Sequence, residues 1–437
     1  MAEALALKGG RPVLPAGAHV RWPVLDSSDK AAVLGVLERG ILSGPFAPEV
    51  RGLEQEFARY VGAKHCLATN SGTAALHIAL AAAGVGPGDE VVTSAFSFVA
   101  TALSVLHQNA IPVFVDIEPV TFGLDPARLE AAITPRTKAI LPVHIHGTPC
   151  RIDEIQAIAK RHGIVVIEDA CQAHGAESSG RKLGTIGAMG TFSIQSSKNL
   201  AAGEGGLFVT DDDALYQQAN RTRMFGEDVK PEDASAYRAD RALDGTRAYD
   251  SLQMGWMYRT NEMTAALARS QLKKLEATNE NARQNAALLS RRLSELKGVR
   301  APVEAEGGKS VIHKYRVRLD AAKLGIEAPA RRVRDAMVKA LSAEGVDAVL
   351  WQTKPVPGQR LFQEKVGYGK GWPWSGAAPV SYDLAQYPET NRLLDDSLVL
   401  FSHTYPIASQ PRSVAEAYAE AFAKVWARLD EVLAATA

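Results

Sequence analysis

The stretch Ile164-Val165-Val166-Ile167-Glu168-Asp169 has the form of a short strand that ends in two acids. Four consecutive apolar residues are typical of a strand covered on both faces, as in a parallel sheet. A lysine, Lys198, follows in the later stretch Thr191-Phe192-Ser193-Ile194-Gln195-Ser196-Ser197-Lys198-Asn199. The sequence therefore predicts an α/β fold with a carboxylate at the carboxyl end of one buried strand and a lysine farther along the chain.

An acid and a lysine of this kind are what pyridoxal phosphate requires. The acid would pair with the pyridinium nitrogen and keep the ring an electron sink, while the lysine would bind the cofactor covalently and later move a proton. A strand that ends in aspartate is also common in proteins without a cofactor, and so is a single lysine farther along the chain. Other parts of the chain must therefore support this interpretation.

Strand and helix patterns alternate on both sides of this stretch. Strands are expected at 90–94, 112–116 and 139–143, and helices at 73–83, 99–108 and 153–161. Such alternation predicts a largely parallel sheet with helices on both faces. Two further runs, at 190–194 and 206–210, leave no room for a crossover helix between them and are expected to be adjacent or antiparallel strands.

The rest of the chain predicts a second, smaller α/β domain. Neither Gly nor Pro occurs from Asn261 to Lys297, which favours one long helix that bridges two domains. Further elements are expected at 314–319 (strand), 329–344 (helix) and 414–434 (helix), with an ordered loop at 355–379. We expect a large domain of residues 1–280, with an N-terminal arm of about 30 residues, and a small domain of residues 281–437.

Composition limits the classes of function. Of the 437 residues, 49 are basic and 49 acidic, so no overall charge favours nucleic acid or an anionic membrane. Three cysteines are too few and too scattered for a disulfide framework. The N-terminal residues lack the apolar core of a signal peptide, and no apolar run approaches the roughly 20 residues that span a bilayer. These features predict a cytoplasmic protein that acts on small molecules.

Three further patterns have two interpretations each. Ala68 to Leu76, with Ser71, Gly72 and Thr73, suits a phosphate at a helix N-terminus, although Ser71 could simply cap the helix. His144 and His146 share a strand face, but without a nearby ligand cluster we expect them to line a pocket and predict no metal site. The basic stretch Arg316 to Arg334 is expected to be a solvated face. Neither a Walker loop nor a dinucleotide-binding glycine motif is present.

Together these segments resemble the DegT/DnrJ/StrS family of pyridoxal-phosphate sugar aminotransferases, which have the fold-type I architecture. The resemblance is densest between residues 66 and 210. It includes the phosphate-binding turn, the segment SAFSFVAT at 94–101, the loop at 142–153, the acid motif EDACQAHGA at 168–176, and the EGG sequence at 204–206. It implies a large domain with a mostly parallel central sheet and a smaller C-terminal α/β domain.

The resemblance also implies roles for single residues. Lys198 would be the catalytic lysine, and Asp169 would hold the pyridinium nitrogen. The phosphate would be bound by Ser193 together with the turn, the ring would stack on an aromatic, and a glutamine would contact the ring or its phenolic oxygen. The matching cofactor-binding positions are Ser71, Gly72, Thr73, Phe98, Gln172 and Ser193. Relatives with histidine in place of the lysine are dehydratases, so Lys198 argues for amino transfer.

One position departs from the family pattern. Many relatives carry an asparagine that reaches across a dimer interface to the cofactor phosphate, and this chain has Met257 there. Methionine cannot donate that hydrogen bond. Arg259 or Asn261 could replace it, so both are predicted as cofactor-binding residues.

The resemblance implies transfer of an amino group from glutamate or glutamine to a keto sugar, nucleotide-linked or free, in secondary-metabolite or surface-glycan biosynthesis. It also implies a homodimer with shared active sites. A keto-cyclitol aminotransferase of the scyllo-inosose type, an aminoshikimate-type aromatising enzyme and a non-catalytic regulator that binds the cofactor remain alternatives. The sequence leaves open the acceptor, the carbon aminated, its stereochemistry and the donor.

Overall fold

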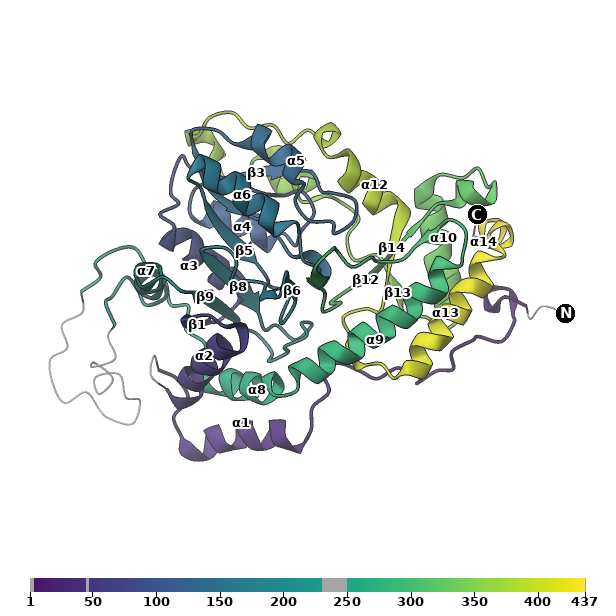
Figure 1. Ribbon diagram of the computed structural model, residues 1–437, viewed down its shortest axis with the longest axis horizontal. Helices are drawn as coiled ribbons and strands as arrows, with labels where there is room; N and C mark the ends of the chain where they lie inside the picture. The colour runs from purple at the N-terminus through teal and green to yellow at the C-terminus, as the bar shows by residue number, and fades with distance from the viewer. Residues whose placement is uncertain (1–3, 45–46, 230–249, 437) are drawn as a thin grey trace.

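The computed structural model describes residues 4–44, 47–229 and 250–436, which form a larger and a smaller α/β lobe (Figure 1). The larger lobe contains a seven-stranded sheet in the order β1-β9-β8-β5-β4-β2-β3. Its strands are His65–Thr69 (β1), Glu90–Ser94 (β2), Ile111–Val115 (β3), Thr137–Leu141 (β4), Val165–Asp169 (β5), Met189–Ser193 (β8) and Gly206–Thr210 (β9). All neighbours are parallel except β9, which is antiparallel to β8 and β1. The predicted parallel sheet and the predicted antiparallel pair are confirmed.

Helices cover both faces of this sheet, as the apolar run at 164–169 requires. Val166 of β5 packs in a cluster with α6, whereas the next residue, Ile167, packs in a cluster with α3 on the other face. This division follows from the alternation of side chains along a strand. The helices of this lobe are Ser27–Arg39 (α1), Pro48–Val61 (α2), Gly72–Ala82 (α3), Ala100–His107 (α4), Pro126–Leu129 (α5), Ile152–His162 (α6), Asp213–Arg223 (α7) and Glu262–Leu272 (α8).

The smaller lobe has an antiparallel sheet in the order β10-β12-β14-β13. Its strands are Val299–Arg300 (β10), Tyr315–Leu319 (β12), Ala348–Val349 (β13) and Ser397–Leu400 (β14). Its helices are Leu275–Ser294 (α9), Ala330–Ala343 (α10), Pro388–Asp396 (α12), Arg412–Trp426 (α13) and Leu429–Ala435 (α14). A small sheet of Gly308–Lys309 (β11), Glu177–Ser178 (β6) and Arg181–Lys182 (β7) joins chain segments of both lobes.

The prediction of one helix from Asn261 to Lys297 is wrong, because α8 ends at Leu272 and α9 begins at Leu275. The backbone tightens between them, where the Lys274 amide donates to the carbonyl of Gln271. Ion pairs stabilise the chain at this break, because Lys274 Nζ lies 2.7 Å from a carboxylate oxygen of Asp26 and 2.7 Å from one of Asp29. Contacts with α1 therefore interrupt a segment that contains neither Gly nor Pro. α9 still runs from the larger lobe into the smaller one (Figure 1).

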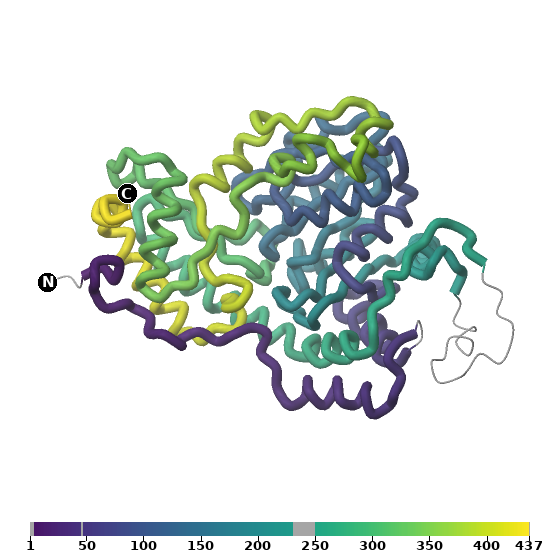
Figure 2. The backbone as a smooth tube through the Cα atoms, turned by 180° about the vertical axis from the view of Figure 1, so that it is seen from behind, coloured from purple at the N-terminus to yellow at the C-terminus, as the bar shows by residue number. Residues whose placement is uncertain are grey.

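Two segments pack across the proposed boundary at residue 280. Leu5 and Leu14 of the N-terminal arm belong to the core of the smaller lobe, and Figure 2 shows the arm running along that lobe to α1. Conversely, Phe362 of the short helix Arg360–Glu364 (α11) and Trp374 pack against the larger lobe at Phe114. The division into residues 1–280 and 281–437 stays a prediction, and it requires the N-terminal arm and the internal segment around Phe362 and Trp374 each to pack against the other domain.

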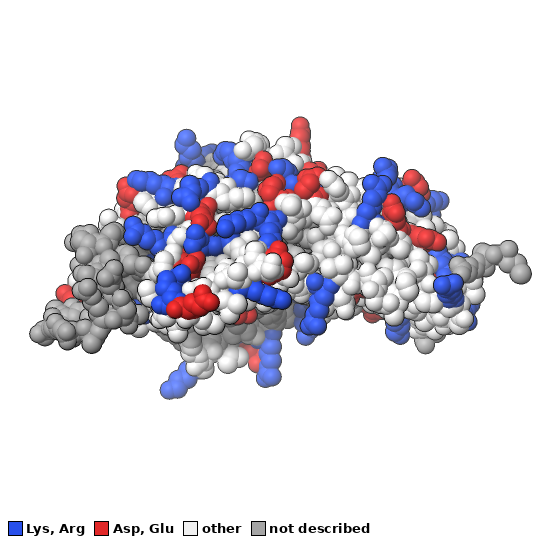
Figure 3. All heavy atoms as spheres, turned by 90° about the horizontal axis from the view of Figure 1, so that it is seen from below, with Lys and Arg blue, Asp and Glu red and all other residues white. Residues whose placement is uncertain are grey.

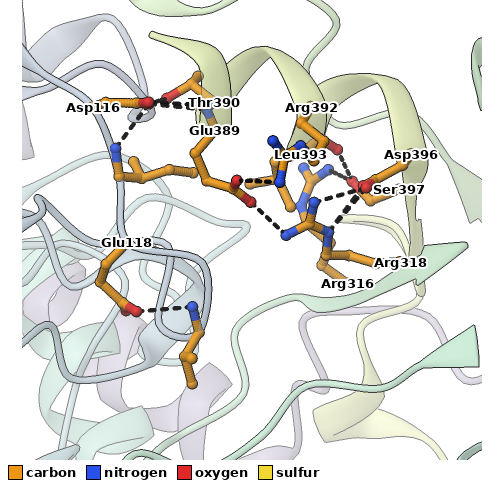
Figure 4. Close-up of polar contacts among 12 residues, drawn as sticks. Asp116, Glu118, Arg316, Arg318, Glu389, Thr390, Arg392, Leu393, Asp396 and Ser397 are labelled. Atoms are coloured by element: carbon orange, nitrogen blue, oxygen red, sulfur yellow. Dashed lines mark hydrogen bonds and ion pairs between the residues drawn. The ribbon is translucent and has the colours of Figure 1, made fainter. Parts of the chain in front are cut away.

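The basic stretch Arg316 to Arg334 is only in part the solvated face we expected, since Lys323, Arg331 and Arg332 are exposed but three of its arginines are not. Arg316, Arg318 and Arg334 are each at most 6% exposed. Arg318 pairs with Glu389 and with Asp396, at 2.7 Å in each case (Figure 4). The prediction fails at these positions because the chain returns through α12 and β14 and brings distant partners: Glu389 and Asp396 to Arg318, and Ser397 to Arg316. Sequence periodicity does not indicate such long-range contacts.

Asp116, which follows β3, links α12 to the larger sheet through hydrogen bonds (Figure 4). Its carboxylate accepts hydrogen bonds from the Glu389 amide at 2.8 Å, the Thr390 amide at 2.9 Å and the Thr390 hydroxyl at 2.6 Å. These amides lie in the first turn of α12, where helix N–H groups lack partners within the helix. A single buried carboxylate thus links the larger sheet to the helix that leads into β14.

We expect Asp116→Ala to lower the free energy of unfolding by about 2–4 kcal/mol, because it leaves buried donors without an acceptor. Urea unfolding measures the change. Asp383→Ala is the matched control, because Asp383 accepts from the Ala385 amide at an exposed position, and a loss of about 0.5–1 kcal/mol is expected there. Equal losses in the two variants would contradict this role of Asp116.

The described part of the chain contains no helix long and apolar enough to cross a membrane. Within the same residues, no group of three or more His, Cys, Asp or Glu side chains is placed to hold a metal ion. On the face drawn in Figure 3, basic and acidic side chains are interspersed, so that this face presents no large patch of one sign.

Candidate active site

A cavity of about 520 Å³ lies at the carboxyl ends of β5 and β8, and it brings together eight of the ten predicted site residues. These are Ser71, Gly72, Thr73, Phe98, Asp169, Gln172, Ser193 and Lys198. They come from separate segments of the sequence, and the sheet places them around one space. This is the edge at which open parallel sheets bind ligands.

Asp169 and the preceding Glu168 point to opposite sides of β5, so the two acids differ in their environments. Asp169 accepts a hydrogen bond from the Thr101 hydroxyl at 2.7 Å and from the Cys171 amide at 3.1 Å, and it faces the cavity. Glu168 is fully buried behind the sheet, where it accepts from the Gly184 amide at 2.8 Å. Asp169 is therefore held in place but keeps acceptor capacity toward the cavity.

The first turn of α3 forms one wall of the cavity. Ser71 Oγ caps the Ala74 amide at 3.0 Å, and the first backbone bond of the helix runs from Ala75 to Ser71. The amides of Gly72 and Thr73 lie before that bond, at the positive end of the helix. A Cβ at Gly72 would lie 2.7 Å from Ser193 Cβ, so only glycine lets this turn approach Ser193. The capping and phosphate-binding interpretations of Ser71 are thus compatible.

Lys198 lies in the loop after β8, partly exposed to the cavity. Its carbonyl accepts a hydrogen bond from Trp22 Nε1 at 3.2 Å, so the N-terminal arm helps to hold the loop. Burial lowers the pKa of Lys198, and the neighbouring Cys171 and Asp169 act in the opposite direction. A lysine whose pKa is lowered is more readily neutral, as a nucleophile or a proton acceptor must be.

Gln172 is oriented by a backbone contact. Its Oε1 accepts from the His146 amide at 2.9 Å, which leaves the Nε2 group as the donor toward the cavity. His144 and His146 do not line this cavity, contrary to our interpretation. His144 Nε2 instead lies 2.9 Å from Glu168, and His146 Nε2 accepts from Arg316 Nε at 3.0 Å.

Arg259 and Asn261, the other two predicted residues, are not among the residues that line the cavity in this chain. Asn261 caps α8, with its side-chain oxygen accepting from the Thr264 amide at 2.9 Å. Arg259 forms a β-bridge with Thr69, just before the phosphate-binding turn. Met257 is 47% exposed. The segment Gly226 to Asp250, which looks unlike the commonest nucleotide-sugar members of the resembled family, lies mostly outside the described residues.

Sequence analysis missed three residues of the site. Thr101 binds Asp169 and has no signal of its own beyond its place in the segment at 94–101. Trp351 and His403 reach the cavity from the smaller lobe, after β13 and β14. His403 follows a buried apolar strand, as Asp169 does, so the same strand-end reasoning could have identified it. Trp351 lies in a stretch without a comparable pattern.

A family model described as the DegT/DnrJ/EryC1/StrS aminotransferase family matches residues 23–393. The chain belongs to this family. It is an aminotransferase with the fold-type I architecture, and the resemblance seen in its motifs is confirmed.

Three similar proteins illustrate the range of the family. The chain is 38% identical to a "Pleiotropic regulatory protein" of Geobacillus stearothermophilus over 84% of its own length and 94% of the relative's. It is 38% identical to the L-glutamine:2-deoxy-scyllo-inosose aminotransferase of Streptomyces paromomycinus, with 74% and 76% covered. The solved structure of S. venezuelae DesV in complex with a ketimine intermediate has a TM-score of 0.76 and 31% identity, with 93% and 99% covered.

Proposed function

We propose that this aminotransferase uses pyridoxal 5'-phosphate to move an amino group from glutamate or glutamine to a keto sugar or a keto cyclitol. The observation that carries the proposal is the placement of Lys198, Asp169 and the helix amides of Gly72 and Thr73 around one cavity. When bound, the cofactor supplies an electron sink for the reacting carbon. The chain supplies binding, orientation and proton transfer.

The residues present fit this cofactor. The amides of Gly72 and Thr73 and the Ser193 hydroxyl offer donors to a phosphate, and Asp169 offers a fixed negative charge to a protonated ring nitrogen. Phe98 is 56% exposed although it lines the cavity, so a stacked ring would cover it. Lys198 would bind the cofactor and carry the proton between substrate and cofactor. Gln172 Nε2 would donate to an oxygen on the ring.

We expect Gly72→Ala to weaken pyridoxal-phosphate binding about 10-fold or more. The new methyl group would lie 2.7 Å from Ser193 Cβ and 3.1 Å from Cys171 Sγ, so the turn must move away, which costs about 1–3 kcal/mol. Fluorescence titration of the apoprotein with the cofactor measures the affinity.

Gly86→Ala is the control for this variant. A Cβ at Gly86 meets no atom within 4 Å, so its affinity should match that of the unmodified protein. Unchanged affinity in Gly72→Ala would argue against this turn as the phosphate site.

A keto cyclitol is a specific candidate for the acceptor. The relative that acts on 2-deoxy-scyllo-inosose supports it, and so does the lining of the cavity, where Lys198 is the single Lys or Arg among the described residues. A neutral acceptor needs no cluster of cations, whereas the diphosphate of a nucleotide sugar does. A regulatory role is the second candidate for the function of this protein, because the Geobacillus relative is named a pleiotropic regulatory protein.

We also propose a homodimer in a reducing, cytoplasmic location. Leu34 and Leu37 of α1 are 55% and 52% exposed, and Met257 and Met263 near the start of α8 are partly exposed as well. The helices α1 and α8 contact each other, and exposed apolar side chains on or near them favour a protein interface. Sedimentation velocity of the unmodified protein tests the assembly. Cys66, Cys150 and Cys171 are all free, which suits a reducing compartment.

The first experiment is a spectrum of the purified protein loaded with pyridoxal phosphate, before and after addition of L-glutamate or L-glutamine. Loss of the long-wavelength cofactor band with one donor, and its return with a keto cyclitol or a keto sugar, would support both halves of the proposal. A band that neither donor changes would favour the regulatory role.

A further inference from the structure

β12 presents three cations in a row on one face. Its residues Tyr315, Val317 and Leu319 belong to the core of the smaller lobe. Because side chains alternate along a strand, Lys314, Arg316 and Arg318 share the opposite face. All three residues are nearly buried, with Lys314 4% exposed. A buried charge without a partner is costly, so the partners of these three side chains indicate what the surface is built to hold.

The three cations differ in their partners. Arg318 pairs with two carboxylates, whereas Arg316 bonds to neutral groups, the Ser397 hydroxyl at 2.8 Å and the imidazole of His146 (Figure 4). Within residues 4–44, 47–229 and 250–436, the ammonium of Lys314 has neither a hydrogen bond nor an ion pair. The carboxylate of Asp347 acts on Lys314 through its charge but forms no ion pair with it among the described residues, so the ammonium can still take a further anion.

Lys314 lies beside the active site, behind the residues that line the cavity and not among them. The adjacent His313 places its Nδ1 3.3 Å from Oδ1 of Asn199, the residue after Lys198. The His313 ring also contacts the ring of His403, which lines the cavity, with 6.3 Å between the ring centroids. Burial and then the charge of Lys198 lower the pKa of Lys314 to about 7, and burial and then Lys314 lower the pKa of His403 to about 4. The three groups thus influence one another.

The other cations near the site already have partners. Arg221 Nε lies 3.1 Å from Asp228, and Arg223 Nη1 lies 2.6 Å from Glu54. Lys198 itself would be occupied by the cofactor. An amino-acid donor brings at least one carboxylate into the cavity, and that carboxylate requires a positive charge.

We propose that Lys314 binds a carboxylate of the amino-acid donor and so selects amino acids as donors. The proposal rests on the proposed function, because it assigns the anion to the donor of that reaction. Lys314 is a binding residue in this view, since it takes no part in proton transfer. The proposed acceptor carries no carboxylate, so the half-reaction with the acceptor should not depend on Lys314.

The test compares the two half-reactions in Lys314→Met, Lys314→Arg and the unmodified protein. Lys314→Met keeps the length of the side chain and removes a buried charge, so the variant should fold normally. Its half-saturation concentration for the reactive donor, L-glutamate or L-glutamine, should rise about 10- to 100-fold. Lys314→Arg should recover part of the loss. The reaction of the aminated enzyme with the acceptor, and the affinity for pyridoxal phosphate, should change less than about 2-fold.

Two controls make the test specific. Lys323→Met removes an exposed lysine of the same lobe and should change nothing. The same donor without its α-carboxyl group should react equally slowly in the unmodified protein and in Lys314→Met. A loss of cofactor affinity with unchanged donor saturation would show that Lys314 serves the cofactor phosphate, which overturns the proposal.

Calorimetry with glutarate separates this inference from the proposed function. The unmodified holoprotein should bind glutarate, and Lys314→Met should bind it at least about 10-fold more weakly. If no donor reacts but glutarate binding still depends on Lys314, the result supports Lys314 as an anion-binding residue and contradicts the proposed reaction. If glutarate binds equally to both proteins, or to neither, the role of Lys314 is wrong.

Discussion

Lys198→Ala is expected to lower the rate of amino transfer by at least about 10⁴-fold, the largest effect of any single substitution in the chain. The cavity lining of the described chain contains no second lysine, so no neighbour can take over the covalent or the proton-transfer role. Single-turnover absorbance measurements with the donor in excess give the rate. The effect concerns chemistry and not folding, because the side chain projects into the cavity.

Rescue by a small amine tests that explanation. Methylamine added to Lys198→Ala should restore part of the rate in proportion to its concentration, because it can carry the proton that the lysine carried. Lys182→Ala, at a lysine on β7 away from the cavity, is the control and should keep the full rate. If Lys198→Ala retained about a tenth of the normal rate, the role assigned to Lys198 would be untenable.

The second large effect is expected for Asp169→Asn, with a loss of about 10²–10³-fold in rate. Asparagine has one acceptor oxygen, whereas Asp169 accepts from both the Thr101 hydroxyl and the Cys171 amide with its two oxygens. It also carries no charge to stabilise a protonated ring nitrogen. The rate of the donor half-reaction should therefore fall, while the affinity for the cofactor phosphate falls much less.

The neighbouring acid provides the matched control. Glu168→Gln makes the same chemical change one residue earlier, on the side of β5 that faces away from the cavity, where Glu168 accepts backbone amides and contacts His144. We expect Glu168→Gln to lower stability with little effect on the rate per folded molecule. Similar rate losses in both variants would mean that Asp169 acts only through the structure of the strand end.

The fold was predictable from the sequence where local pattern decides the structure. β8 and β9 are short buried runs, and their antiparallel pairing follows from the short spacing between them. The break between α8 and α9 was not predictable, since ion pairs of Lys274 with α1 produce it. The burial of Arg316 and Arg318 could not be predicted for the same reason, because their partners lie far away in the sequence: His146 and Ser397 for Arg316, and two acids of α12 for Arg318.

The candidate site divides in a similar way. Residues in motifs at strand ends and helix starts, such as Ser71 and Asp169, were identified because local chemistry and the family resemblance agree on them. Trp351 and His403 were not assigned to the site, since they approach from the smaller lobe and their position depends on how the two lobes pack. The proposal for Asn261 depends on a second subunit, which a single chain does not contain.

The contact of Trp22 with the carbonyl of Lys198 has a consequence for biosynthesis. The Trp22 amide also donates to the carbonyl of Thr404, so segments that are about 180 and 200 residues apart in the sequence meet beside Lys198. Domains fold from the N-terminus as the ribosome extends the chain. A nascent chain can therefore complete the seven-stranded sheet once Thr210 has been made, but it can complete these contacts around Lys198 only after Thr404 has followed.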